Sequence, residues 1–116
     1  MARTEITRTD LRSAAVDLST AGAAAELTDG NSFAWSADRV LYVDNGDAVD
    51  LTVTVQTPVT IGRQARPVDD YDVVVPAGTA ALLPRLGPEY RQPDDGAVWV
   101  DYAGATGSVT VAVFDL

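Results

Sequence analysis

The sequence predicts an all-β protein, an antiparallel β-sandwich or jelly-roll-like barrel with an N-terminal arm. The segment 51-LTVTVQT-57 alternates apolar and polar residues with a period of two, and 108-SVTVAVF-114 repeats that pattern near the C-terminus. Turn formers such as 44-DNGD-47, 76-PAG-78 and 104-GATG-107 separate further short runs of β-branched, aromatic and aliphatic residues. Since no long helix pattern is convincing, roughly six or seven short strands should form two packed layers.

Residues 1–30 differ from the rest because they are rich in Thr, Ala and Arg and end in the turn-like 28-TDGN-31. Two structures compete here. Thr9 or Asp10 could cap a short helix, with Gly22 interrupting its apolar stripe of Leu11, Ala14, Ala15 and Leu18. An extended arm with a loop fits equally well. We therefore divide the chain into residues 1–30, an arm or a short helix with a loop, and residues 31–116, a single β-sandwich domain.

From Ser32 onward the patterns are those of strands. In chain order we expect them at 39-RVLYVDN-45, 51-LTVTVQT-57, 72-DVVV-75, 79-TAALLP-84, 97-AVWVDYA-103 and 108-SVTVAVF-114. The predicted core is Phe33, Leu41, Val43, Leu51, Val53, Val55, Ile61, Val74, Leu82, Val98, Val100, Tyr102, Val109, Val111 and Val113. Trp99 is out of step with Val98 and Val100, so it faces either a second buried layer or a partner, or it closes the end of its own core.

The segment 84-PRLGPEYRQPDDG-96 lies between two expected strands and is the most irregular stretch of the chain. Pro84, Pro88 and Pro93 remove backbone donors and stiffen it, which argues against a central strand. The segment can cover one end of the sandwich, with Tyr90 tucked beneath it. It can also contact another protein, because tyrosine and arginine are enriched in interface hot spots. The two roles are compatible.

The composition limits the chemistry. With 116 residues the chain is one domain that removes very roughly two-thirds of its unfolded surface from water. It has no cysteine and no histidine, which excludes thiolate metal sites, a cysteine nucleophile, histidine-ligated zinc and a Ser-His-Asp triad. Catalysis would therefore depend on carboxylates, hydroxyls or a borrowed metal.

The charge and hydropathy patterns limit the partners. All eight cations are arginine, and the formal charge is −9, so the surface repels nucleic-acid phosphates unless the arginines gather on one face. The chain has no run of eighteen apolar residues, and 1-MARTEITRTDLR-12 lacks the apolar stretch of a secretory signal. We therefore expect neither nucleic acid nor a membrane as a partner.

Acidic residues gather at 44-DNGDAVD-50, 69-DDYD-72 and 94-DDG-96. Such clusters can bind Ca²⁺, but none follows the EF-hand pattern, and Asp and Asn are also common turn residues. Glu89 with Asp94 or Asp95 is the pair that could resemble glycosidase carboxylates. Acids in a solvated loop are the simpler interpretation, so we expect no enzyme activity, no cofactor and no metal site.

Several segments together resemble a known family. They are 2-ARTEIT-7, 32-SFAWS-36, 39-RVLYVDNGDA-48, 51-LTVTVQTP-58, 76-PAGTAALLPRLGPEYRQPDDGAVWVDY-102 and 107-GSVTVAVFDL-116. In this arrangement the chain resembles small virion structural proteins of tailed phages that infect GC-rich actinobacteria. The resemblance covers most of the chain. It implies a small β-sandwich associated with the phage head or head-tail region and brings no catalytic residues with it.

The resemblance implies capsid decoration, with the major capsid protein or neighbouring virion proteins as partners. The protein would be made in the host cytoplasm and reside on the capsid surface. The alternatives are a head-tail or tail structural protein and a module that binds carbohydrate or a host surface. A homo-oligomer, with a trimer favoured, is compatible with decoration. We expect partner contacts at Arg3, Arg8, Arg85, Tyr90, Arg91 and Trp99.

Overall fold

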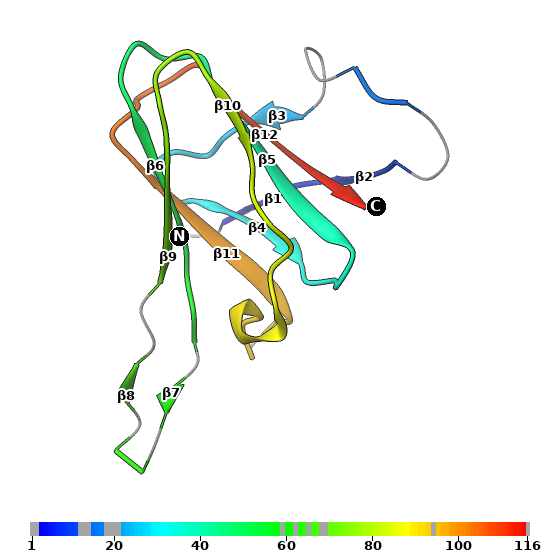
Figure 1. The fold of residues 1–116 in the computed structure, drawn as a ribbon, viewed down its shortest axis with the longest axis vertical. Helices are drawn as coiled ribbons and strands as arrows, with labels where there is room; N and C mark the ends of the chain where they lie inside the picture. Colours follow the sequence, from blue (N-terminus) through cyan, green and yellow to red (C-terminus); the bar gives the residue numbers. More distant parts are fainter. Residues whose placement is uncertain are drawn as a thin grey trace.

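The computed structural model describes residues 3–11, 15–17, 22–58, 60–61, 63–64, 66–67, 70–93 and 95–115. These residues form a β-sandwich of two five-stranded mixed sheets, as Figure 1 shows, so the predicted fold class is confirmed. No α-helix occurs within the described ranges, and no helix there is long and apolar enough to cross a membrane.

The first sheet has the strand order β1-β4-β11-β6-β9. Its strands are β1 (Thr4–Glu5), β4 (Asn31–Ala34), β11 (Ala97–Ala103), β6 (Leu51–Val55) and β9 (Tyr71–Val75). The alternation in 51-LTVTV-55 behaves as predicted, because Leu51, Val53 and Val55 are buried while Thr52 and Thr54 lie on the other face. β9 is the last strand in this order and forms one edge of the sheet.

The second sheet has the order β10-β5-β12-β2, and β3 also pairs with β12. Its strands are β10 (Ala80–Leu82), β5 (Arg39–Asn45), β12 (Val109–Asp115), β2 (Arg8–Asp10) and β3 (Ala23–Ala24). β2 and β3 pair with different parts of β12, since β2 reaches residues 113–115 and β3 reaches residues 110–111. The remaining elements are a small hairpin of β7 (Thr60–Ile61) and β8 (Arg66–Pro67), below the sandwich in Figure 1, and the 3-10 turn η1 (Pro88–Tyr90).

The N-terminal arm is extended where the structure describes it, and it links the two sheets. β1 runs parallel to β4 in the first sheet, and a few residues later β2 runs parallel to β12 in the second. Ile6 lies between β1 and β2, and its side chain is buried in the core. These two pairings correct the prediction of purely antiparallel sheets. Of the proposed helical stripe, Ala14 and Leu18 lie outside the described residues, and residues 15–17 have no regular secondary structure.

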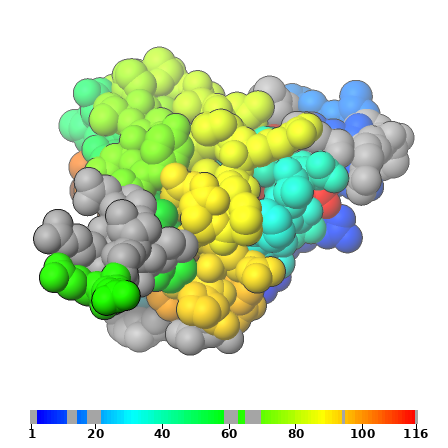
Figure 2. All heavy atoms as spheres, turned by 60° about the horizontal axis from the view of Figure 1, so that its bottom comes forward, coloured from blue at the N-terminus to red at the C-terminus, as the bar shows by residue number. Residues whose placement is uncertain are grey.

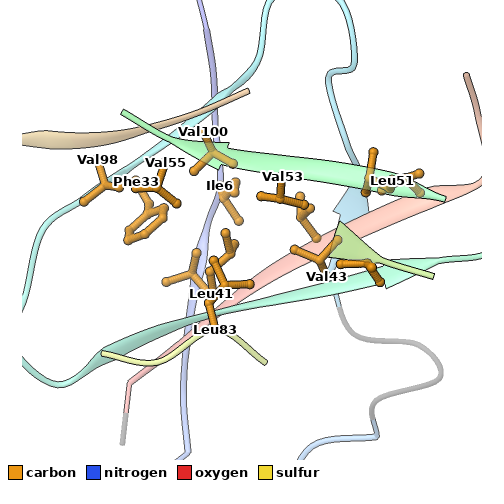
Figure 3. Packing of buried hydrophobic residues seen from close by; sticks show 14 of the residues in the cluster. Ile6, Phe33, Leu41, Val43, Leu51, Val53, Val55, Leu83, Val98 and Val100 are labelled. Carbon is orange, nitrogen blue, oxygen red and sulfur yellow. The ribbon is translucent and has the colours of Figure 1, made fainter. Parts of the chain in front are cut away.

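The main core lies between the sheets. Figure 3 shows Ile6 among Val100, Val53 and Leu41, with side chains from both layers pointing toward it. Each fully buried valine or leucine contributes about 1.5–3 kcal/mol to the hydrophobic stabilisation. The predicted core residues that are buried are Phe33, Leu41, Val43, Leu51, Val53, Val55, Val98, Val100, Val109, Val111 and Val113.

The predicted burial of two residues was wrong. Val74 and Leu82 are each 58% exposed, whereas their neighbours Val75 and Leu83 are buried. In both segments several apolar residues follow one another, so the sequence does not show which of them face the core. In the structure the neighbouring residues, Val75 and Leu83, face it. Tyr102 is only partly buried but packs against the core, and the side chain of Ile61 lies outside the described part.

A second apolar cluster lies on the outer face of the second sheet. Its buried members are Val40 and Tyr42 of β5 and Ala112 and Phe114 of β12. The rings of Tyr42 and Phe114 are 6.0 Å apart, and Leu11 and Val16 of the N-terminal segment pack against the cluster. The N-terminal arm covers this outer face. β5 and β12 therefore carry buried apolar residues on both faces.

The segment after β10 covers one end of the sandwich. Leu83 and Leu86 are buried, and Tyr90 packs against the core. In Figure 2 this yellow segment occupies the middle of the face. The covering role expected for residues 84–96 is therefore confirmed for the described part of the segment.

Candidate interaction surface

The structure places the six predicted contact residues in different surroundings. Arg3 and Trp99 come together on the outer face of the first sheet. Tyr90 and Arg91 lie at the covered end of the sandwich, where they meet Tyr71 and Trp35. Arg8 lies on β2 beside the C-terminal strand, and Arg85 is exposed in the segment after β10.

The Arg3–Trp99 site begins with the alternation of β11. Val98 and Val100 are buried in the core, so Trp99 and Asp101 lie on the opposite, outer face. The arm brings Arg3 to this face, where its guanidinium carbon lies 5.0 Å from the centroid of the Trp99 ring. This distance is within the range of a cation–π contact. Trp99 is partly buried and has Arg3 as a neighbour on the outer face.

Hydrogen bonds fix both side chains in place. Arg3 Nη1 donates to Asp101 Oδ1 at 2.7 Å and to the Val100 carbonyl oxygen at 3.1 Å. Trp99 Nε1 donates to Asp95 Oδ2 at 3.2 Å, and Gln56 Nε2 donates to Asp101 Oδ2. The planar groups of Arg3 and Trp99 are thus held before any partner arrives.

The charges at this site are balanced by direct contacts. Partial burial by itself raises the pKa of Asp101, but the hydrogen bonds from Arg3 and Gln56 and the Arg3 charge outweigh it, so this pKa is lowered. Asp101 therefore remains a carboxylate at neutral pH. An open hollow of about 400 Å³ adjoins the pair and is lined by Arg3, Ser32, Asp95 and Trp99.

A second arginine–tryptophan contact lies at the covered end. The guanidinium carbon of Arg91 is 5.8 Å from the centroid of the Trp35 ring, and Trp35 Nε1 donates to the Leu86 carbonyl oxygen at 2.9 Å. The rings of Tyr71 and Tyr90 are 6.3 Å apart. Burial raises the pKa of Tyr90, and the neighbouring Glu89 carboxylate and Tyr71 raise it further, so the hydroxyl is neutral at physiological pH. Arg91 is exposed, whereas Tyr90 is engaged in closing the sandwich.

Arg8 has a structural role that sequence reasoning missed. Its Nη1 donates to Asp115 Oδ2 at 2.7 Å, and Arg39 Nε donates to Asp115 Oδ1 at 2.7 Å. The Arg39 hydrogen bond lowers the pKa of Asp115; burial opposes this effect, and the Arg8 hydrogen bond adds to the lowering. The carboxylate thus connects β2, β5 and β12 at the end of the chain. A lone aspartate beside the C-terminus carries no sequence signal for this role.

The acidic clusters have local structural roles where the structure describes them. Asp47 Oδ2 accepts hydrogen bonds from the backbone N–H groups of Thr106 and Gly107, at 3.1 and 3.2 Å, and its pKa is lowered mainly by the first. Asp50 Oδ1 accepts from the Ala77 N–H at 3.0 Å. Within the described ranges no group of three or more acidic side chains is placed to hold a metal ion.

The described residues do not support a catalytic pair of Glu89 with Asp94 or Asp95. Asp95 accepts hydrogen bonds from the Ala97 N–H at 2.9 Å and from Trp99, so its carboxylate organises the turn before β11. Glu89 is exposed, and Asp94 lies outside the described residues.

Comparison with known proteins gave no match: no protein-family model, no curated protein and no solved structure corresponds to this chain. Within this chain, two arginine–tryptophan contacts, Arg3 with Trp99 and Arg91 with Trp35, lie on the surface of the sandwich.

Proposed function

We propose that this protein is a virion structural protein, and specifically a capsid decoration protein that binds the outside of a phage head. Its segments resemble those of small β-sandwich virion proteins, and the β-sandwich itself is observed. In this role it bridges major capsid proteins or neighbouring virion proteins. It stabilises the shell by binding a surface that the assembled state alone presents.

The Arg3–Trp99 contact is the observation that carries the proposal. Tryptophan and arginine are among the residues that contribute most to binding energy at protein interfaces. Here both are held by neighbours, at 2.7 Å for Arg3 to Asp101 and 3.2 Å for Trp99 to Asp95. Side chains that are already ordered lose little entropy on docking. Arg91 over Trp35 supplies a second contact of the same kind.

The charge of the protein supports the outer surface as its location. At −9 the chain would be repelled by the densely packed DNA phosphates inside a head. The outer shell imposes no such penalty. A homo-oligomer, with a trimer favoured, would suit the symmetry axes of a shell.

The direct experiment mixes the purified protein with undecorated capsids and measures binding by co-sedimentation. We expect saturable, stoichiometric binding that Trp99→Ala or Arg91→Ala weakens by at least about tenfold, the loss expected when one hot-spot residue is truncated. Arg63→Ala is the matched control, because Arg63 is an exposed arginine in the turn between β7 and β8. Failure to bind any capsid or connector component of its own phage would remove the proposal.

The hollow beside Trp99 favours a second candidate, a module that binds carbohydrate or a host surface. Its lining combines an aromatic ring with the hydrogen-bonding groups of Arg3, Ser32 and Asp95. Arg3 already lies against the ring, which leaves less of the indole for stacking on a sugar. A glycan array without signal, with and without Ca²⁺, would exclude this candidate. Binding to the connector but not to the capsid would instead indicate a head-tail protein.

A further inference from the structure

Two large apolar side chains are exposed on the edge strands of the sandwich. Val74 of β9 and Leu82 of β10 are each 58% exposed, and Val49 is the other large exposed apolar side chain among the described residues. β9 and β10 are consecutive strands joined by the turn at residues 76–79, and each forms an edge of its own sheet. Edge strands present backbone groups that can pair with an added strand.

The pairing of β6 fixes which backbone groups of β9 point outward. The Gln56 N–H donates to the Trp99 carbonyl oxygen at 3.0 Å, so every second residue of this strand, Thr54 and Thr52 included, directs its backbone toward β11. Leu51, Val53 and Val55 therefore direct theirs toward β9, to Val75, Val73 and Tyr71. The backbone N–H and C=O groups of Asp72 and Val74 consequently point away from the sheet.

The side chains along this edge are apolar and acidic. Asp72 and Val74 lie on the outer face and are exposed. Asp72 Oδ1 accepts a hydrogen bond from Thr54 Oγ1 at 2.8 Å. At the start of the strand the exposed Asp70 accepts from the Thr57 N–H at 2.9 Å. An added strand would find two carboxylates and one valine on this face.

We propose that the β9 edge binds an extended basic segment of a partner protein by strand addition. An arginine or lysine of that segment lies opposite Asp72, and an aliphatic residue lies opposite Val74, which are favourable cross-strand pairs. A second copy of this chain fits less well, because antiparallel registers that place Asp72 opposite Asp72 or Val74 of the other copy bring the two Asp72 carboxylates directly or diagonally opposite each other. The binding mode goes beyond the virion role and does not rest on it.

The edge of β10 is less suitable for the same purpose. β10 has three residues against five in β9. It leads directly into Leu83, whose N–H is bonded to the Leu41 carbonyl oxygen at 2.8 Å, and then into Pro84, which has no N–H. Short strands and proline are recognised ways of protecting a sheet edge. Leu82 therefore provides a control position with the same exposure as Val74.

The test uses the full chain labelled with ¹⁵N and, as the probe, a short peptide of repeated Arg-Thr-Val-Thr units, in which arginine and valine alternate along one face of the added strand. We expect saturable changes in amide chemical shifts centred on Asp72 and Val74. The same peptide with N-methyl groups on alternate amides, which cannot donate along one edge, should bind at least about tenfold more weakly if backbone pairing is involved. Equal binding of the two peptides would overturn strand addition.

Variants separate the edge from general charge attraction. Asp72→Lys should weaken binding of the arginine peptide, whereas Asp38→Lys, the same charge change at an exposed turn residue, should weaken it less. Val74→Pro should abolish the shifts and Leu82→Thr should preserve them. The proposal would be overturned if Asp72→Lys and Asp38→Lys had equal effects, or if Val74→Pro and Leu82→Thr did. It would also be overturned if the peptide did not bind, or if sedimentation equilibrium showed a dimer that depends on Val74. Because the assay contains no virion component, its result is independent of capsid binding.

Discussion

The guanidinium carbon of Arg3 lies 5.0 Å from the centroid of the Trp99 ring, while its Nη1 donates to Asp101 at 2.7 Å. One residue near the N-terminus thereby connects the arm to the central strand of the first sheet. The same pair forms the candidate interaction surface. If the proposed partner binds here, stability and binding are coupled at this position, so variants must be examined for both.

Replacing Arg3 by alanine should lower the free energy of unfolding by about 1 kcal/mol, because a partly exposed ion pair and a cation–π contact are lost together. Arg3→Lys keeps the charge but loses the planar contact, so it should fall between alanine and the native residue. Urea unfolding followed by tryptophan fluorescence measures both. Arg63→Ala serves as the control, and an equal loss in that variant would contradict the assigned contacts.

Asp115 should make the fold sensitive to acid. Its pKa is lowered in the folded state by the hydrogen bond from Arg39, with a further contribution from Arg8. The stabilisation is therefore present above the unfolded value of about 3.9 and is lost as the pH falls through the lower folded value. Urea midpoints measured from pH 6 to pH 2 should decrease as the pH falls below about 4, where Asp115 begins to take up a proton.

The variant Asp115→Asn should lose about 2 kcal/mol or more at pH 7, since two arginines lose their charged partner at a buried position. Its further loss between neutral and acid pH should be smaller than that of the native chain. Asp38→Asn, at an exposed turn residue, should leave the stability at pH 7 within about 0.5 kcal/mol. An unchanged acid profile in Asp115→Asn would show that other carboxylates govern the transition.

Gly30 is required both by its conformation and by its neighbours. Its φ is +83°, and an added Cβ would meet Arg3 Nη1 and the Val100 carbonyl oxygen. Gly78 also has a positive φ, +71°, but a Cβ there would meet nothing within 4 Å. Gly78→Ala should cost about 1 kcal/mol for the backbone conformation alone, and Gly30→Ala should cost more. Equal losses in thermal or urea unfolding would contradict the close packing around Gly30.

Burial predicts opposite outcomes for two aliphatic residues. Ile6→Ala should lower the free energy of unfolding by about 2–5 kcal/mol, because Ile6 is buried between the sheets. Val74→Ala should change it by less than about 0.5 kcal/mol, since Val74 is exposed. Chemical denaturation of both variants decides this. A large loss of unfolding free energy in Val74→Ala would contradict the exposed position of Val74.

The sequence predicted strands well where polar residues alternate with apolar ones, as threonine does with valine in β6. It failed at Val74 and Leu82 because adjacent apolar residues do not reveal which face they occupy. The parallel pairing of the arm was not predictable, since a parallel partner far along the chain leaves no local pattern. Arg3 and Trp99 were each predicted from residue type to contact a partner, and that remains a prediction; the contact between the two side chains was not predicted, because it depends on the position of the arm.

The proposed capsid role is tested most directly by the amount of this protein in purified phage particles, measured by quantitative mass spectrometry against the major capsid protein. We expect a fixed ratio to the capsid protein, and loss of the protein when intact particles are treated with protease. Absence from the particles, or protection from protease within the head, would contradict a decoration protein on the outer shell.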